Sequence, residues 1–563
     1  MNQIDSGDTT WLLVSTAFVM LMTPAVGFFY GGMVRQKNVL AMMGQSMVIL
    51  ALISLQWFLV GYSLSFAAPA FPWIKGWIGS LDWFALNKVT TTPFEAYAAG
   101  VPHLAFMLFQ CMFAVITPAL IIGAFADRVK LDTFILFTLL WSTLVYDPVA
   151  HWVWAEDGWL KALGSLDFAG GTVVHITAGA SALASAMIIG KRLGFGEERM
   201  PAHNIPFTIL GGALLWFGWF GFNAGSALGD ESLAVHVAVT TNLAAAAAAI
   251  AWIVASRILK AKPSVSGIII GSVAGLVAIT PACGFVSPVS AVIIGFVSGI
   301  LCYLAMNLRG KLDVDDSLDV LACHGIGGIW GAIATGLFAE KAINAAGANG
   351  LLFGNSNLLW IQLLAVLVTI VYSFLVTSII LFILKKTVGL RVSVEEERQG
   401  LDISQHGEEA YVMLPIGDDD SKALQVLEAI KVSEVMNIKV RTASLDDDLE
   451  KIQDLMLEKQ HFALPVVDDN RHVLGIITIA DVRKIDKSDR KNVKVKKVYT
   501  KEIQVAYPEE SIHDLIQRMQ EKHISNLPVI QSDGEKKLVG IISKTDLIKA
   551  YKNIASEGLK KGN

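Results

Sequence analysis

Asp167-Phe-Ala-Gly-Gly-Thr-Val-Val-His175 is one of two stretches that decide the fold of this chain, and the other is Asp316-Ser-Leu-Asp-Val-Leu-Ala-Cys-His324. Both place an aspartate eight residues before a histidine at the start of an apolar segment. Eight helical residues rise about 12 Å, which carries each histidine toward the middle of a membrane core about 30 Å thick. The two segments are the fifth and the tenth apolar stretches of the chain, so they begin on opposite sides of the membrane. This predicts two inverted five-helix halves with a site between them.

The chain around these stretches is strongly apolar. Its 563 residues are 53% hydrophobic and 17% charged, and the mean hydropathy is +0.53, which excludes an ordinary soluble protein. A membrane span needs about 20 apolar residues. Eleven stretches qualify, at about 11–34, 39–66, 103–125, 131–154, 170–190, 204–222, 234–256, 266–283, 287–307, 319–338 and 356–384. We expect an all-α bundle of eleven transmembrane helices, the eleventh standing outside the two repeats, with its termini on opposite sides.

The basic residues of the loops predict the orientation. The first ten residues contain no Lys or Arg, which argues against a cleaved signal peptide and for an external N-terminus. One side of the membrane receives Arg35, Lys37, Arg128, Lys130, Lys191, Arg192, Arg199, Arg257, Lys260, Lys262, Arg309, Lys311, Lys385, Lys386 and Arg391. The other side receives only Lys75, Lys88, Lys161 and Lys341. By the positive-inside rule we expect a multi-pass protein of the inner cell membrane with a cytoplasmic C-terminal tail.

Charge divides the chain into two parts. Residues 1–391 contain 19 Lys/Arg and 19 Asp/Glu, whereas residues 392–563 contain 26 and 31. All 14 Trp and all four Cys lie in the first part, so the tail resembles a small soluble domain of a reducing compartment, and no disulfide framework is expected. A net charge of −5 and a pI near 6.1 give no reason to expect nucleic acid binding.

Few ionisable residues lie at membrane depth, where they are costly and usually functional. They are Asp167, His175, Asp316, Asp319 and His324. Each aspartate can also act as a helix N-cap, and a lone membrane histidine can serve packing alone. Two histidines at equivalent positions of inverted halves favour a paired pore or substrate site. Burial disfavours a charged imidazole, so we expect neutral rings that pass a proton or line the path of a small polar solute.

Aromatic side chains gather near the outer ends of several predicted spans, where Phe109, Phe113, Trp154, Trp219 and Phe222 are found together with Ser226. Such residues are typical of a core or of an interfacial belt. A ring beside an external mouth can also bind a cation through its π face.

Several ordered segments resemble the Amt branch of the ammonium transporter family. Besides the two stretches quoted first, they are Gly27-Phe-Phe-Tyr-Gly-Gly-Met-Val-Arg-Gln-Lys-Asn38, Gly218-Trp-Phe-Gly-Phe-Asn-Ala-Gly-Ser226 and Thr280-Pro-Ala-Cys-Gly284. The resemblance covers residues 10 to about 410. It implies ammonium or ammonia as substrate, a homotrimer in membrane lipid with one pore in each subunit, and no enzymatic activity.

The resemblance also implies roles for individual residues. Trp154 and Ser226 fall at an external ammonium site, with Phe109 near it and Asp167 supporting recruitment of the cation. Phe113 and Phe222 fall at the gate, and His175 and His324 at a twin-histidine path. Supporting positions are Gln110, Trp219, Asp316 and Asp319. The stretch 155–159 departs from the family's glycine-rich run after Trp154. Carriage of neutral ammonia alone and of ammonia with a separately transferred proton are both open.

The tail contains an internal repeat. Val432-Ser-Glu-Val-Met436 corresponds to Val495-Lys-Lys-Val-Tyr499, Leu464-Pro465-Val466 to Leu527-Pro528-Val529, and Gly475-Ile-Ile-Thr478-Ile-Ala-Asp481 to Gly540-Ile-Ile-Ser543-Lys-Thr-Asp546. Apolar β-type runs followed by amphipathic helices predict an α/β fold for each unit. We expect a membrane domain at 1–388, a C-terminal region and linker at 389–425, with Asp418–Ser421 as linker, and repeats at about 429–488 and 492–555 within 426–563.

The repeat resembles a tandem CBS pair, a module that often binds adenine nucleotides between its halves. The resemblance implies a regulatory ATP, ADP or AMP at Pro465, Val466, Thr478, Asp481, Pro528, Val529, Ser543 and Asp546. Ser/Thr followed three residues later by Asp is also a variant of the capping box, so a purely structural or dimerising module is the alternative. Both roles are compatible, because a helix N-terminus suits phosphate.

The sequence features are compatible with more than one class of function. The first expectation is an ammonium transporter tuned by a nucleotide sensor, and the second is an ammonium sensor that signals through the tail. An intramembrane metalloprotease would require His-Glu-x-x-His, which does not occur around His103, His151, His175 or His324, so no metal is expected. A CBS-regulated ion channel of another family fits the architecture but not the motifs. A soluble nitrogen-signalling protein that plugs the pore from inside is a possible partner.

Overall fold

The computed structural model describes residues 4–198, 200–229, 232–259, 261–309, 314–411, 428–458, 463–486, 489–501, 503–522, 524, 526–543 and 546–547. The predicted linker Asp418–Ser421 lies outside these residues, as do Arg199, Lys260 and Lys311 of the basic count. The chain forms two units, residues 1–411 and 412–563.

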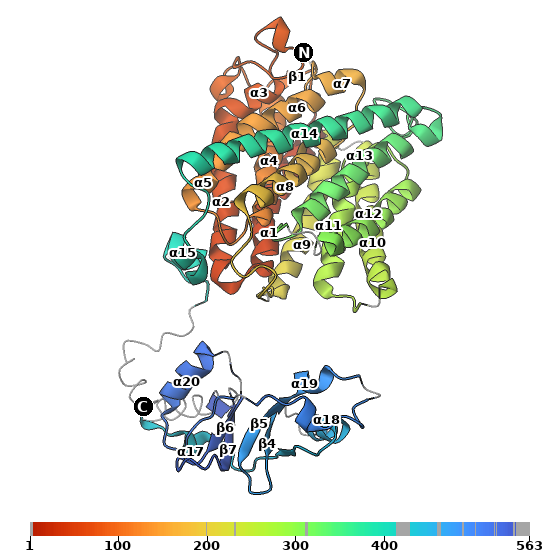
Figure 1. Ribbon diagram of the computed structural model, residues 1–563. Helices are drawn as coiled ribbons and strands as arrows, with labels where there is room; N and C mark the ends of the chain where they lie inside the picture. Colours follow the sequence, from red (N-terminus) through yellow and green to blue (C-terminus); the bar gives the residue numbers. More distant parts are fainter. Residues whose placement is uncertain are drawn as a thin grey trace, which may run out of the picture. The chain divides into compact units, whose positions relative to one another are not determined.

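The first unit is a bundle of apolar helices (Figure 1). Among the described residues, ten helices are long and apolar enough to cross a membrane: Ser6–Met33, Gln36–Phe66, His103–Ala124, Leu131–Leu163, Gly171–Ile189, Ile205–Ala227, Ser232–Ile258, Pro288–Leu308, Leu321–Phe338 and Ser356–Thr387. The eighth predicted span is the shorter helix Val265–Ile279. The eleven predicted stretches therefore all form helices.

The named elements of this unit follow that order. The regular helices are α1 (Ser6–Met33), α2 (Val39–Gln56), α3 (Tyr62–Phe66), α4 (His103–Ile121), α5 (Leu131–Trp141), α6 (Asp147–Trp154), α7 (Trp159–Leu163), α8 (Thr177–Ile189), α9 (Ile205–Trp219), α10 (Ser232–Ile258), α11 (Val265–Ile279), α12 (Pro288–Arg309), α13 (Gly327–Phe338) and α14 (Ser356–Thr387). A two-stranded antiparallel sheet, β1 (Pro93–Phe94) and β2 (Ala98–Pro102), precedes α4.

Several spans contain a π-helical turn. These turns are η2 (Trp57–Gly61), η6 (Ser142–Tyr146), η7 (Gly171–Ile176), η8 (Phe220–Ala224) and η10 (Leu321–Ile326). Such turns are rare and occur frequently at functional sites. Two of them, η7 and η10, begin the fifth and tenth spans of the inverted halves.

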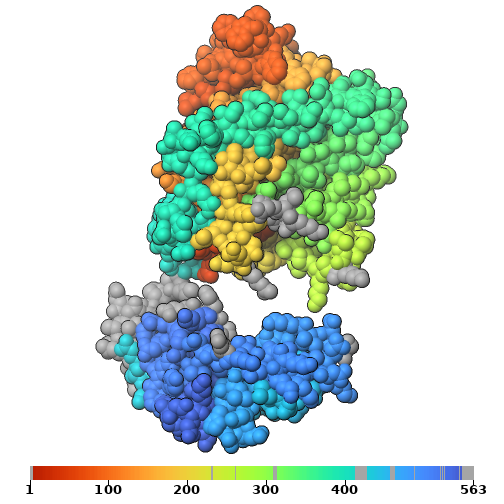
Figure 2. Space-filling view, viewed as in Figure 1, coloured from red at the N-terminus to blue at the C-terminus, as the bar shows by residue number. Residues whose placement is uncertain are grey.

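Helix α14 runs across the face of the bundle, as Figures 1 and 2 show. It packs against α8 and α13. Its other face exposes the large apolar side chains Trp360, Leu367, Leu375, Ile379 and Phe382. A long apolar helix with such a face is compatible with lipid or with a second subunit.

The segment after α14 folds back onto the same unit as α15 (Val394–Gln399) and η12 (Asp402–His406). Ser393 begins α15 through a reciprocal capping box with Glu396. The Ala41 N–H donates to the Asp402 carboxylate at 2.8 Å, and the Leu401 N–H donates to the Asn38 side chain at 2.8 Å. Leu401 and Asp402 are thus hydrogen-bonded to the start of α2.

The second unit contains both repeats. Its elements are α17 (Val432–Val435), β3 (Ala443–Ser444), α18 (Leu449–Glu458), β4 (Ala463–Val467), β5 (Val473–Thr478), α19 (Ile479–Arg483), η13 (Val495–Lys497), α20 (Ile512–Glu521), β6 (Asn526–Ile530) and β7 (Leu538–Ser543). Strand β3 is parallel to β4, and β4–β5 and β6–β7 are antiparallel pairs. The expected α/β fold is confirmed.

The two repeats exchange their first segments. Val432, from the start of the first repeat, lies in the core of the second with Ile512 and Leu527, whereas Val495 lies in the core of the first. The backbones of Ile476 and Thr500 also pair across the repeats, as do those of Asn437 and Ile541. Because each core needs a piece of the other, we expect the two repeats to fold together.

Candidate functional site

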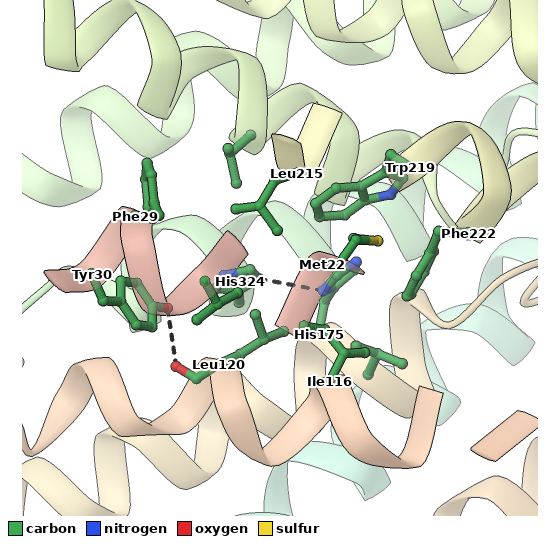
Figure 3. A pocket seen from close by; sticks show the side chains of 13 residues that line it. Met22, Phe29, Tyr30, Ile116, Leu120, His175, Leu215, Trp219, Phe222 and His324 are labelled. Carbon is green, nitrogen blue, oxygen red and sulfur yellow. Dashed lines mark hydrogen bonds between the residues drawn. The ribbon is translucent and has the colours of Figure 1, made fainter. Parts of the chain in front are cut away.

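Two histidines face each other at the centre of the first unit (Figure 3). The Nδ1 atoms of His175 and His324 lie 3.3 Å apart, and the ring centroids lie 5.3 Å apart with an angle of 29° between the planes. Both side chains are buried. A hydrogen bond between these nitrogens requires one Nδ1 to donate and the other to accept, so the pair can share one proton at this contact.

An aspartate fixes the start of each histidine helix. The Asp167 carboxylate accepts hydrogen bonds from four backbone N–H groups, those of residues 170–173, at 2.7 to 3.2 Å. The Asp316 carboxylate accepts from the Leu321 N–H at 2.8 Å. The histidine follows within the π-helical turn in both halves. The N-cap interpretation of both aspartates therefore agrees with these contacts.

The histidines meet because two glycines bring their helices into contact. A Cβ added to Gly179 of α8 would lie 2.3 Å from the Gly325 Cα in η10. No larger residue fits there without movement of one backbone. Small residues at helix crossings allow this close approach in membranes.

The rings line a narrow apolar cavity of about 10 Å³. Its other lining residues are Met22, Val26, Phe29, Tyr30, Ile116, Leu120, Val174, Leu215, Trp219, Phe222 and Val273. Trp219 stacks on His175 with centroids 5.6 Å apart, and its Nε1–H donates to the Thr280 hydroxyl at 2.9 Å. The cavity offers no cage of oxygens that could replace the water around a cation, so it favours a small neutral solute.

Two phenylalanines lie between this cavity and a larger, outer cavity. The rings of Phe113 and Phe222 lie 4.3 Å apart between centroids, and Phe109 packs edge-on against Phe113 at 5.0 Å. Phe113 lines the outer cavity and Phe222 the inner one. The two rings thus close the path between the cavities.

The outer cavity has a volume of about 180 Å³, and we call it the vestibule. Its lining residues are Phe66, Ala96, Tyr97, Phe106, Gln110, Phe113, Trp154, Lys161, Phe168, Ser226 and Leu228. Gln110, Phe113, Trp154 and Ser226 were predicted from the sequence, and the fold brings these four together. Phe109 lies behind Phe113 and is not among the lining residues. The sequence prediction missed Tyr97 and Lys161, which lie outside the matched motifs, and Phe168, which lies inside one of them but was not singled out.

A third cavity, of about 30 Å³, lies on the other side of the histidines from the vestibule. His324, Tyr30, Cys323 and Asp319 are among its lining residues. Asp319 has a φ of 60°, a conformation that is uncommon for residues other than glycine. The Tyr30 hydroxyl donates to the Leu120 carbonyl at 3.0 Å, as Figure 3 shows.

One buried polar cluster was missed from the sequence. Asp147 lies fully buried in the fourth span, where it accepts a hydrogen bond from Gln56 at 2.8 Å. His151, one turn later, contacts the Ser65 carbonyl at 3.1 Å and the Asp157 carboxylate at 3.6 Å. Both are ionisable residues inside an apolar run, which is the signal that could have identified them.

The second unit contains a large cleft of about 770 Å³ between the two repeats. Its polar lining includes Thr500, Lys501, Gln504, Asn526 and Lys536, and apolar residues of β5 and β6 complete it. Of the predicted nucleotide-binding residues, Pro528 lines this cleft. Ser543 pairs with Asn526 in the β6–β7 register and therefore lies at the edge of the cleft.

The predicted residues of the tail also have structural positions. Val466 and Val529 are buried in the two repeat cores, and Pro465 and Pro528 lie in β4 and β6. Thr478 and Asp481 form a reciprocal capping box, and the Ser543 hydroxyl donates to the Asp546 carboxylate at 2.6 Å.

The contacts of Asp481 change its acidity. Partial burial opposes ionisation of Asp481, but the Thr478 hydrogen bond and the Lys484 ammonium at 2.9 Å bring its pKa below the usual value. The carboxylate is therefore ionised at neutral pH. In the described part of the chain, no group of three His, Cys, Asp or Glu residues could hold a metal ion.

Comparisons with known proteins agree with this arrangement. Residues 10–411 match the Ammonium Transporter Family, and residues 432–488 and 495–553 each match the CBS domain. The Bacillus subtilis ammonium transporter is 48% identical over 406 residues, which cover 72% of this chain and 98% of the relative. The ammonium transporter Amt1 of Archaeoglobus fulgidus is 50% identical over 408 residues, covering 72% of this chain and all of the relative.

Solved structures show the same fold for the first unit. The crystal structure of Saccharomyces cerevisiae Mep2 aligns with a TM-score of 0.65 at 37% identity, covering 69% of this chain and 91% of Mep2. A structure described as a sensor Amt protein aligns with a TM-score of 0.65 at 32% identity, covering 71% of this chain and 98% of the other. Both similarities extend over about seven tenths of the chain.

Proposed function

The chain belongs to the ammonium transporter family, and from this premise we propose that ammonium is recruited in the vestibule and that its nitrogen crosses the membrane past the twin histidines. The family transports ammonium and is not a family of enzymes. The observation that carries the proposal is the 3.3 Å contact between the two buried imidazoles, in an apolar cavity behind two phenylalanine rings tilted against each other.

Recruitment rests on the chemistry of the vestibule. Aromatic faces at Phe113 and Trp154 attract a small cation through their π systems, and the Ser226 hydroxyl offers an oxygen acceptor. The Trp154 indole is held in place because its Nε1–H donates to the Asp167 carbonyl at 3.1 Å. Asp167 therefore supports the site in two ways. Its backbone carbonyl holds the Trp154 indole, and its carboxylate accepts the N–H groups at the start of the histidine helix.

Passage requires the substrate to lose charge. A bare cation would have to leave water for the apolar cavity, which is far more costly than the transfer of neutral ammonia. Ammonia can be handed along the imidazoles as a hydrogen-bond donor and acceptor. The released proton either returns to the outside or follows separately along the histidine pair, and these two cases differ in the net charge that each transport cycle moves.

The test of the pore is transport by reconstituted protein. In proteoliposomes exposed to an ammonium pulse, His175→Ala and His324→Ala are expected to change flux or selectivity against methylammonium. Each variant removes one of the two imidazoles that contact each other in the cavity. His236→Ala is the matched control, since His236 contacts the Val286 carbonyl away from the pore. Wild-type flux and selectivity in both pore variants would overturn the twin-histidine path.

The tail supplies regulation in this proposal. An adenine nucleotide binds the CBS pair in the cleft beside Ser543 and Asp546, where Lys501 and Lys536 neutralise its phosphates. Binding is measured by calorimetry on the full-length protein with ATP, ADP and AMP. Asp546→Ala is expected to weaken binding. An unchanged isotherm in the Asp481→Ala/Asp546→Ala double variant would leave these residues only their capping role.

Assembly and orientation complete the proposal. The protein is a homotrimer with one pore in each subunit, its N-terminus outside and its CBS pair in the cytoplasm of the cell, where a soluble nitrogen-signalling protein is a further candidate partner. The basic residues concentrated on one side of the bundle support this orientation. Native mass spectrometry tests the trimer. Protease accessibility of the tail in inside-out vesicles tests the orientation.

A sensor is the second candidate, favoured by the similarity to a sensor Amt protein over 98% of that chain. In that case ammonium binds in the vestibule and changes the tail without net transport. Ammonium-dependent binding in the absence of any flux or current would select this alternative.

A further inference from the structure

An ion pair stands at the mouth of the vestibule. Lys161, in α7, lines the vestibule, and its Nζ lies 2.6 Å from the Glu156 carboxylate. The same Nζ lies 3.4 Å from the Trp154 carbonyl oxygen. A primary ammonium group therefore already contacts the residue whose ring forms one wall of the proposed ammonium site.

Glu156 is held beside the vestibule by its ion pair with Lys161 and is not itself one of the lining residues. Glu156 lies in the stretch 155–159, and Lys161 follows two residues after that stretch ends.

The pair is weak enough to open. The Lys161 and Glu156 side chains are 40% and 54% exposed, and exposed pairs contribute little because water screens them. An entering ammonium ion can therefore compete for the Glu156 carboxylate and the Trp154 carbonyl, which accept hydrogen bonds from any ammonium group.

Other charged groups nearby are already engaged. Asp157 lies 3.6 Å from His151, and the Asp167 carboxylate accepts four backbone N–H groups.

We propose that Lys161 is a tethered competitor of the substrate: its ammonium group occupies the acceptors at the vestibule mouth and, with Glu156, sets the affinity for external ammonium. This inference rests on recruitment at Trp154 and Ser226. Removal of the lysine leaves a carboxylate that attracts the cation, and removal of the glutamate leaves a cation that repels it.

The experiment measures the KM for ammonium uptake at low and at high ionic strength in proteoliposomes. At low salt, Lys161→Gln is expected to lower KM by a factor of about 2 to 5, and Glu156→Gln to raise it by a similar factor. The double variant returns toward the wild-type KM, and 0.5 M salt removes most of the single-variant shifts because the Debye length becomes shorter. Lys75→Gln, an exposed lysine of an external loop, is the matched control for a simple loss of surface charge.

The outcomes separate this inference from the proposed function. Ser226→Ala is measured in the same assay, and a raised KM there together with an unchanged KM in Lys161→Gln overturns the tethered competitor while keeping the recruitment site. A raised KM in Lys161→Gln, or a Lys75→Gln shift of equal size, also overturns it. If Ser226→Ala leaves KM unchanged, the recruitment site itself is refuted.

Discussion

At the scale of single residues, Asp167 shows how a buried carboxylate can satisfy the backbone inside a membrane protein. Its carboxylate satisfies four N–H groups at the start of the histidine helix. Left unpaired in an apolar surrounding, those donors would each be costly. Asp316 accepts a hydrogen bond from the Leu321 N–H at the start of the other histidine helix, so an aspartate caps this helix in both inverted halves.

This gives a prediction for Asp167→Asn. An amide retains one acceptor oxygen and turns an NH₂ group toward N–H donors, so we expect a loss of stability of about 2 kcal/mol and a slower flux. Thermal unfolding of the purified protein measures the first effect and ammonium uptake the second. Asp132→Asn, in the exposed first turn of α5, is the matched control. A variant with wild-type stability but lost uptake would favour direct recruitment of the cation over capping.

At the scale of elements, the contact between α8 and η10 sets the distance between the histidines. Gly179→Ala would place a methyl group 2.3 Å from the Gly325 backbone, whereas Gly325→Ala meets first the flexible end of Leu321 at 2.9 Å. We therefore expect Gly179→Ala to lose about 1–3 kcal/mol and most of its uptake, and Gly325→Ala to lose much less.

The control for this prediction is Gly44→Ala in α2, where the nearest atom to the added methyl is 4.0 Å away. Uptake assays and thermal unfolding of the three variants decide the order. Equal behaviour of Gly179→Ala and Gly44→Ala would show that the helices have room to move apart.

The helices were easier to predict than their detail. Apolar runs of about 20 residues identified all eleven helices, because membrane spans depend on composition and length. The π-helical turns at η7 and η10 could not be predicted, since they depend on contacts between helices distant in sequence. The motifs predicted the pairing of His175 with His324 and a vestibule site at Trp154. Lys161, in α7, and Tyr97, between β1 and β2, belong to no motif and were not predicted to line the vestibule.

The tail shows the same limit. The repeat with its offset of 63 to 65 residues indicated two similar α/β units, and the structure has them. The exchange of Val432 and Val495 between the two cores was not visible in the pattern, because each residue is also compatible with the core of its own unit. Val466 and Val529, expected at the nucleotide, lie in those cores instead.

At the scale of the whole molecule, the division into residues 1–411 and 412–563 predicts where the chain can be cut. A chain ending at Tyr411 is expected to keep stability and uptake and to lose its response to nucleotides. A chain ending at Val388 is expected to be less stable, because it loses the Asp402 and Leu401 hydrogen bonds to α2. Expression, thermal unfolding and uptake of the two truncations test this, and equal stability would show that α15 and η12 contribute little.

The four cysteines, Cys111, Cys283, Cys302 and Cys323, are all buried in the first unit. A thiol-reactive dye therefore has few native targets on the folded protein. One cysteine introduced at the exposed Lys386 and another at the exposed Lys497 would carry a fluorophore pair without prior removal of native thiols. Energy transfer between such dyes would report movements of the CBS pair relative to the membrane when a nucleotide binds. The four native cysteines could stay in place during this measurement.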